Sequence, residues 1–128
     1  MTHLSELLRA NKSRSTLLVL FVPSKNRFGV QIDQSRWVDE ALGVLGTGFG
    51  GATAFPQARG VWRDDSRGGV LVYDEPVVIE CYTNEELIEQ NAEILREFLV
   101  RMGKETGQGA IGFVIDRDYL EIQFPLTE

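Results

Sequence analysis

Six residues have side chains suited to catalysis or ligand contact, and all lie between positions 53 and 108. The most unusual is Glu80, which stands in an apolar, strand-forming segment between Ile79 and Cys81. A carboxylate in such surroundings needs a hydrogen-bond donor, or its pKa rises and it keeps its proton. A raised pKa suits a general acid or base. We therefore predict Glu80 as the catalytic candidate, with a buried structural ion pair as the alternative. The donors that the sequence offers are Thr53, Arg59, Tyr82 and Gln108.

The other candidate residues would position a ligand. Arg59 and Trp62 combine a guanidinium with an aromatic ring, which suits an anionic or planar group. The same residues would equally form cross-strand pairs that stabilise a hairpin. Gln108 either satisfies the backbone of its loop or points into a pocket. The predicted ligand-binding residues are Thr53, Arg59, Trp62, Tyr82 and Gln108.

The chain offers few groups for metal or covalent chemistry. Cys81 is the only cysteine and His3 the only histidine, which excludes an internal disulfide and disfavours a catalytic triad or a His- or Cys-based metal site. We predict no cofactor and no metal, with an all-carboxylate Mg²⁺ site as an open alternative. The glycines from Gly46 to Gly51 follow a helical segment and precede a strand, and no Gly-Lys-Ser/Thr follows them. They are expected to end the helix rather than to bind phosphate.

Two helices and five strands are expected to hold these residues. The first helix begins near Asp33 or Ser35 and carries one apolar stripe as far as the glycines. The second begins at a capping box formed by Thr83 and Glu86 and ends near Gly103. The expected strands are 16–22, 52–63, 70–82, 110–116 and a last one from 119 to 123 or 124. A short amphipathic helix precedes them and carries Leu4, Leu7 and Leu8.

This order of elements predicts an α+β fold of the ferredoxin-like type. The expected architecture is a split β-α-β-β-α-β antiparallel sheet with an extra C-terminal strand and a short N-terminal helix. We expect a single α+β domain over residues 1–128, with 1–13 as an N-terminal arm.

The two middle strands should form a hairpin centred on residues 66 and 67. That register places Trp62 opposite Leu71 and, farther from the turn, Thr53 opposite Glu80. Pro56 lies within the first of these strands, opposite a proline-containing segment of the second. Both strands should bulge there, so the register is open to a slip by one residue.

The second face of the sheet needs a cover. Helices of this fold cover one face only, yet the segments 16–22 and 110–115 are apolar on both faces. A contiguous exposed apolar face is costly. We therefore predict a homodimer packed sheet to sheet. The alternatives are that the N-terminal helix or the last strand folds back over this face.

The charge and hydropathy of the chain limit the kinds of molecule that it is expected to bind. The net charge is −6, but residues 1–36 hold six Lys or Arg against two acids, either as a solvated surface or as a basic patch for an anion or acidic partner. The acidic balance disfavours nucleic acid, whose binding is mostly phosphate neutralisation. No apolar run approaches the roughly 20 residues of a membrane span, and the start lacks the pattern of a secretory signal. We predict a cytoplasmic protein without a membrane partner.

Several short motifs resemble those of a family of small bacterial proteins of unknown function. They are Gly50-Gly51-Ala52-Thr53, Gly60-Val61-Trp62-Arg63-Asp64, an acidic strand residue at Glu75 or Glu80, and Gly107-Gln108 after the last helix. The resemblance covers about residues 18–115 and implies one α+β domain, with no activity to transfer. The strand order is also similar to that of small ferredoxin-like nucleases. Those enzymes place a catalytic Asp at the end of the first strand, where this chain has Val22-Pro23-Ser24.

The sequence thus predicts a non-catalytic, dimeric ferredoxin-like module that binds a protein partner or a small ligand, as an accessory or regulatory subunit. The alternative is a small enzyme of the same fold, in which Glu80 is the acid/base. Arg59, Trp62 and Gln108 would then position an anionic or aromatic small molecule. A third hypothesis is a nucleic-acid-associated protein that uses the basic N-terminal third.

Overall fold

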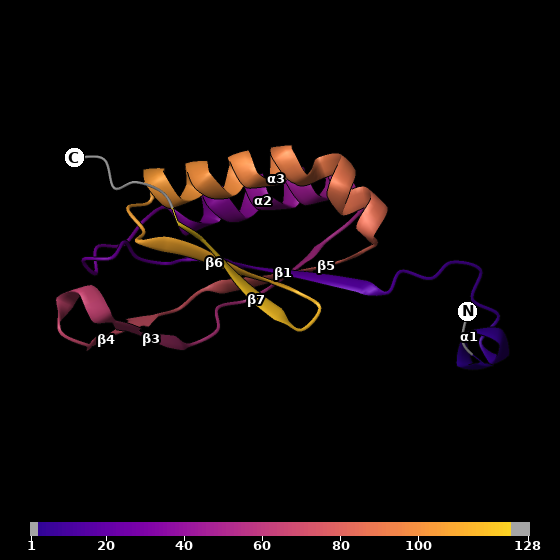
Figure 1. The fold of residues 1–128 in the computed structure, drawn as a ribbon, viewed down its shortest axis with the longest axis horizontal. Coiled ribbons are helices and arrows are strands. Elements are labelled where there is room, and N and C mark those ends of the chain that lie inside the picture. Colours follow the sequence, from indigo (N-terminus) through magenta and orange to yellow (C-terminus); the bar gives the residue numbers. More distant parts are fainter. Residues whose placement is uncertain (1–2, 124–128) are drawn as a thin grey trace.

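The computed structural model describes residues 3–123 and has a helical layer above a β-sheet (Figure 1). The elements in chain order are α1 (His3–Leu7), β1 (Thr16–Val22), α2 (Gln34–Phe49), β2 (Thr53–Phe55), β3 (Gly60–Asp64), the 3₁₀ turn η1 (Asp65–Arg67), β4 (Val70–Asp74), β5 (Val77–Thr83), α3 (Glu85–Glu105), β6 (Ala110–Ile115) and β7 (Asp118–Gln123). None of the helices in this range has the length and apolarity that a bilayer span requires. The last strand is predicted to end at residue 123 or 124; β7 is described as far as Gln123, and residue 124 lies outside the described residues.

The main sheet confirms the predicted fold class. Its five strands lie in the order β2-β5-β1-β6-β7, and each pair of neighbours is antiparallel. The first strand therefore lies between the strand that precedes α3 and the strand that follows it, as a split β-α-β-β-α-β topology requires. β7 extends one edge as the extra C-terminal strand.

The core lies between α2, α3 and one face of this sheet. Alternate residues of β1 point to that face, because successive side chains of a strand point to opposite sides; these are Leu18, Leu20 and Val22, each at most 1% exposed. Both helices present a buried stripe to it. The stripe of α2 is Trp37, Ala41, Leu45 and Phe49, and that of α3 includes Leu95, Phe98, Leu99 and Met102. Burial of each large side chain contributes roughly 1.5–3 kcal/mol, so this layer fixes the sheet on whose other face a site can form.

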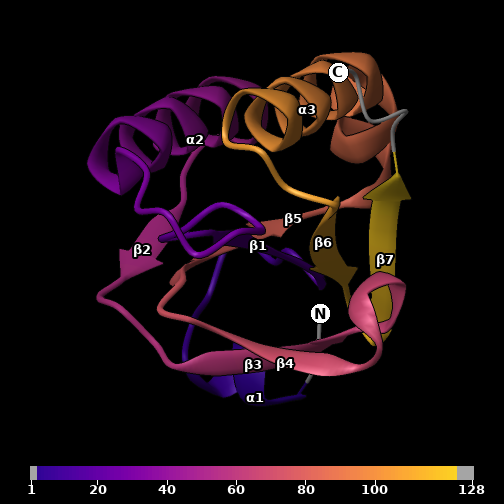
Figure 2. The same ribbon diagram turned by 90° about the vertical axis from the view of Figure 1, so that its left-hand side faces the viewer.

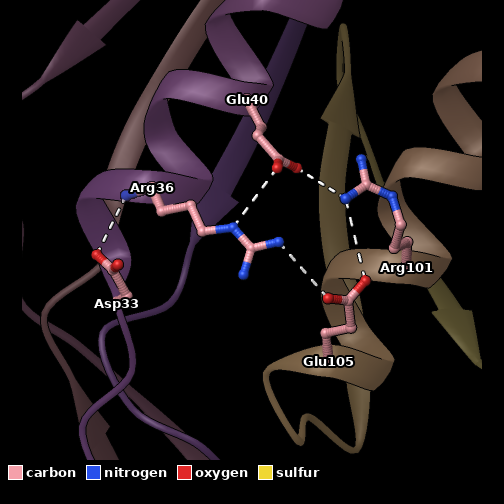
Figure 3. A network of polar contacts seen from close by, with 5 residues as sticks. All are labelled: Asp33, Arg36, Glu40, Arg101 and Glu105. Atoms are coloured by element: carbon pink, nitrogen blue, oxygen red, sulfur yellow. Dashed lines mark hydrogen bonds and ion pairs between the residues drawn. The ribbon is translucent and has the colours of Figure 1, made fainter.

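Four charged residues join the outer sides of α2 and α3 (Figure 3). Arg101 donates a hydrogen bond of 2.8 Å to Glu40, while Arg36 lies 3.6 Å from Glu40 and 3.7 Å from Glu105. The hydrogen bond from Arg101 holds the pKa of Glu40 below its ordinary value. Each of these side chains stays about a third or more exposed to water. The network therefore adds little to the free energy of unfolding.

The two long strands predicted over 52–63 and 70–82 are each two strands. The interruptions fall at Pro56 and Pro76, which lack the amide donor that a ladder needs. Beyond them β3 and β4 form a separate two-stranded sheet. Figure 2 shows this hairpin on the side of the main sheet opposite α2 and α3.

The break also changes the register. On the main sheet Thr53 pairs with Glu80, as the sequence predicts. In the hairpin Trp62 pairs with Val72 instead of Leu71. The predicted register is therefore wrong by one residue on the hairpin side, because the tip holds the additional 3₁₀ turn η1 rather than a tight two-residue turn.

The end of α2 differs from the prediction. The helix continues through Gly46 to Phe49, and Gly50, whose φ of 92° is left-handed, caps its C-terminal end. Packing against α3 overrides the low helix propensity of the glycines. At Gly48 the absence of a side chain lets Asn91 approach, and the Asn91 amide donates a 3.0 Å hydrogen bond to the Gly48 carbonyl.

The bounds of α3 also differ. The N-cap is Asn84, whose side chain accepts a 2.9 Å hydrogen bond from the Leu87 amide. Thr83, the predicted cap, is fully buried at the end of β5. At the other end the helix passes the predicted stop, the buried Gly103, and reaches Glu105.

The face of the main sheet away from the helices is covered only in part. The hairpin lies over it, but α1 buries none of its residues and β7 extends the sheet edge instead of folding back. Both alternative covers predicted for this face are therefore absent from the described residues. The homodimer stays a prediction.

Candidate functional site

A cleft of about 290 Å³ lies between the hairpin and the helix-free face of the main sheet. The sheet contributes Phe21, Gly112, Tyr119 and Glu121, and the hairpin contributes Trp62, Asp64, Ser66 and Asp74. The remaining lining residues come from the loops after β1 and α3 and from the start of β6: Pro23, Arg27, Gln108, Gly109, Ala110 and Ile111.

The pairing of β6 with β7 sets the floor of the cleft. Gly112 pairs with Glu121, and the next pair on the same face joins Val114 to Tyr119. The side chains of Tyr119 and Glu121 therefore point the same way. The Tyr119 ring lies across Gly112, because a Cβ built on Gly112 would fall 2.6 Å from the Tyr119 Cζ atom. Only a glycine at position 112 leaves room for the Tyr119 ring in this position.

Two of the three carboxylates in the cleft are already used by the fold. Asp64, 7% exposed, accepts hydrogen bonds from the Ser66 hydroxyl and from the Arg67 Nε, each 2.6 Å long. These bonds, first that of Ser66, hold the pKa of Asp64 below its ordinary value. Asp74 accepts from the Ser24 amide at 3.0 Å and from the Ser24 hydroxyl. Both carboxylates therefore position backbone rather than ligand.

Glu121 is the carboxylate that remains for a ligand. Within residues 3–123 it makes neither a hydrogen bond nor an ion pair. Burial raises the pKa of the neighbouring Tyr119 phenol, and the charge of Glu121 raises it further. Tyr119 therefore stays protonated at neutral pH and acts as a hydrogen-bond donor, while Glu121 acts as an acceptor or base.

The side of the cleft near the loop after β1 is held by several contacts. Gln108 donates to the Lys25 carbonyl at 2.7 Å, and the Arg27 amide donates to the Gly107 carbonyl at 3.0 Å. Arg67, at the hairpin tip, donates to the Arg27 carbonyl at 2.9 Å. An isolated two-stranded hairpin is marginally stable, so this contact helps to hold the hairpin over the sheet.

The structure brings two of the six predicted site residues into the cleft, Trp62 and Gln108. Gln108 uses its amide on loop carbonyls, which is the backbone role that the sequence left open. Arg59 lies in a separate hollow with Lys25 and Tyr73. Thr53, Glu80 and Tyr82 lie on β2 and β5 and line none of the described hollows. Glu80 as a catalytic group stays a prediction.

Sequence reasoning missed Tyr119 and Glu121. The signal for them is the alternation along 118–123, which puts both on one face of the closing strand opposite Leu120 and Ile122. It also missed the burial of Asp64, which the sequence presents only as the last residue of the Gly60-Val61-Trp62-Arg63-Asp64 motif and which lies buried at the hairpin tip. No cluster of three or more His, Cys, Asp or Glu suited to a metal is found in the described part of the chain.

Two solved structures are similar to this chain over nearly its whole length. One is a phage SAM lyase in complex with S-methyl-5'-thioadenosine, with a TM-score of 0.69 and 17% identity, covering 92% of this chain and 98% of the lyase. The other is a phage SAM lyase in the apo state, with a TM-score of 0.64 and 14% identity, covering 92% and 96%. At these identities the likeness establishes the fold alone.

No family model and no curated protein matches the sequence. The resemblance to the small bacterial family therefore stays a prediction. Our prediction of a non-catalytic module is wrong on the present findings, because both chains that share the fold are enzymes. The alternative of a small enzyme agrees better with them.

Proposed function

We propose that this protein is a small enzyme that binds S-adenosylmethionine in the cleft and releases S-methyl-5'-thioadenosine. The observation that carries the proposal is a cleft lined by three aromatic rings and one uncommitted carboxylate, Glu121. The substrate is suggested by the similar phage lyase, whose structure contains S-methyl-5'-thioadenosine. Of the two predicted ligand classes, anionic or aromatic, the proposal keeps only the aromatic one.

The chemistry of the cleft suits an adenosine attached to a positive charge. Phe21, Trp62 and Tyr119 offer faces for stacking on adenine and for attraction of a sulfonium. Asp64 is paired with Arg67, so the charges that remain at the cleft are those of Asp74 and Glu121 against the one lining cation, Arg27. This small negative balance favours a cationic ligand. The cleft's volume of about 290 Å³ lies just below the range of roughly 300–1,000 Å³ for small-molecule sites, which suits a ligand as small as a nucleoside.

The reaction requires one bond to break. The bond between the sulfonium sulfur and the γ-carbon of the amino-acid arm breaks, and its electron pair stays on sulfur to give the neutral thioether. Two routes account for the four-carbon amino-acid fragment that is released from the sulfur. Its own carboxylate attacks the γ-carbon to give a lactone, with no proton transferred, or Glu121 takes a proton from the β-carbon to give an alkene. In both routes Glu121 faces the positive end of the substrate.

This proposal replaces Glu80 with Glu121 as the acidic group that acts on the substrate. The reason is placement, since Glu121 lines the cleft and Glu80 does not. Arg59 has no part in it, because it lies in the other hollow. We also propose the cytoplasm as the location, since an intracellular metabolite is the substrate.

The test is to incubate the purified protein with S-adenosylmethionine and to quantify S-methyl-5'-thioadenosine by chromatography. The wild-type protein should form it faster than the buffer control does. Glu121→Gln should lower the rate at least roughly tenfold, a modest effect for a group acting on the reacting atoms. The matched control is Glu93→Gln, an exposed carboxylate on α3 that should leave the rate unchanged.

Two outcomes would contradict the proposal. No thioether above the buffer control would overturn the enzyme itself. A loss of activity in Glu80→Gln but not in Glu121→Gln would move the chemistry to the sequence-predicted residue. Mass spectrometry of the four-carbon product separates the lactone from the alkene.

A further inference from the structure

We propose that the N-terminal arm (residues 3–13) binds the open sheet face of a second copy of this chain. The open sheet face is the part of the helix-free face formed by Leu17, Val19, Glu80, Tyr82 and Val114. The inference concerns assembly and does not depend on the proposed reaction.

The arm has an apolar stripe with nothing to bind in its own chain. Leu4, Leu7 and Leu8 are 67%, 65% and 80% exposed. A helix of five residues is not stable alone in water, because nucleation is costly. The arm therefore needs a partner surface to keep this helix.

The root of the arm is fixed, and the remainder projects from the domain. Arg14 donates a 2.6 Å hydrogen bond to the Phe49 carbonyl and a longer one to the Tyr82 carbonyl. Beyond this point Figure 1 shows the chain leading away from the sheet to α1. Figure 2 shows α1 on the same side of the main sheet as the hairpin, which is the helix-free side. A second copy that faced this side would stand within reach of the arm.

The open sheet face has an apolar surface with one unpaired acid. A row of paired residues crosses it in the order Thr53, Glu80, Val19, Val114 and Tyr119. Glu80 is only partly exposed, and within residues 3–123 it has neither a hydrogen bond nor an ion pair. A partly buried carboxylate among apolar neighbours is stabilised by a cation or by hydrogen-bond donors. The surface thus suits a ligand that is both apolar and basic.

The arm has this composition. Its residues 3–13, with Arg14, hold three Lys or Arg against one Glu, whereas the rest of the chain holds ten against eighteen acids. Arg9 and Lys12 follow the leucine stripe directly and can pair with Glu80 of another copy. Since each chain carries one arm and one open sheet face, a closed symmetric assembly in which each arm binds the face of the next copy would satisfy both.

The test compares the self-association of variants by sedimentation equilibrium at micromolar and higher concentrations. The wild-type chain should associate. Leu4→Glu with Leu7→Glu should raise the dissociation constant at least roughly tenfold, since two aliphatic side chains lose their burial. The control with the same number of charges at exposed apolar sites outside both surfaces is Val30→Glu with Ile94→Glu; it should associate like the wild type.

A charge exchange tests the pairing at Glu80. Glu80→Lys should weaken association, and adding Arg9→Glu with Lys12→Glu should restore it, which a merely structural role of Glu80 would not do. A monomeric wild type would overturn the proposal. Association of the leucine variant as strong as that of the wild type would also overturn it. If that variant also had a lower melting temperature, the leucines would pack on the arm's own domain instead. Binding of the arm to anionic lipid vesicles without self-association would also overturn it, in favour of a membrane surface.

Discussion

At the scale of single residues, Gly112 decides the shape of the cleft floor. Its missing side chain lets the Tyr119 ring lie across β6, beside the carboxylate of Glu121. This arrangement sets a protonated phenol next to an uncommitted carboxylate. The pair gives the cleft a hydrogen-bond donor and an acceptor side by side on one face of β7.

The first prediction at this scale concerns Gly112→Ala. The new methyl group would lie 2.6 Å from Cζ and 2.9 Å from Cε2 of Tyr119, so the ring must move out of the cleft floor. Affinity for S-methyl-5'-thioadenosine, measured by calorimetry, should fall by roughly 1 kcal/mol or more, the range of one aromatic contact. Gly51→Ala, which meets nothing within 4 Å, is the control. Equal affinities for the two variants would show that the Tyr119 ring takes no part in binding.

Residue types predicted part of the site. Trp62 is predicted because an aromatic ring combined with the guanidinium of Arg59 suits ligand contact, although Arg59 itself lies in another hollow. Glu80 attracts attention because its sequence neighbours are apolar, but those neighbours point to the helices while Glu80 points to the other face. Tyr119 and Glu121 have ordinary surface-strand sequence. Only the placement of the hairpin above them makes them part of a cleft.

At the scale of elements, the prolines predicted correctly where strands end, whereas the glycines predicted the end of a helix wrongly. Pro56 and Pro76 correctly mark where the hairpin leaves the main sheet, because a missing amide cannot be compensated by packing. The glycines of α2 wrongly suggest an early helix end, because a cost of about 1 kcal/mol for each is within reach of tertiary contacts. The packing that overrides them, between Gly48 and Asn91, joins residues far apart in the sequence.

A prediction for this element contrasts two glycines of α2. Gly43→Ala should raise stability by about 0.5–1 kcal/mol, because Gly43 lies in a helix and a methyl group there meets nothing within 4 Å. Gly48→Ala brings the same helix propensity, but its methyl group would lie 2.9 Å from the Asn91 Oδ1 atom. Thermal unfolding should therefore show a higher midpoint for Gly43→Ala and no gain, or a loss, for Gly48→Ala. Equal gains would mean that Asn91 does not restrict the approach of the helices.

At the scale of the whole molecule, the main sheet has the hydrophobic core on one face and the cleft on the other. The helices and the buried stripes lie on one face, while the cleft and the open sheet face share the other. The order of elements was sufficient to predict this topology, because a split β-α-β-β-α-β pattern has few ways to form a sheet. It could not predict the cleft, since nothing in the order of elements tells over which part of the sheet the hairpin folds.

The most direct measurement of the central claim is a ¹H–¹⁵N NMR titration of the protein with S-methyl-5'-thioadenosine. The chain has two tryptophans, Trp62 in the cleft and Trp37 in the core, 3% exposed. The cleft account predicts that the indole signal of Trp62 and the amide signals of Gly112 and Glu121 shift with increasing ligand, while the indole signal of Trp37 stays in place. No shift at saturating ligand, or shifts confined to the hollow around Lys25 and Arg59, would contradict it.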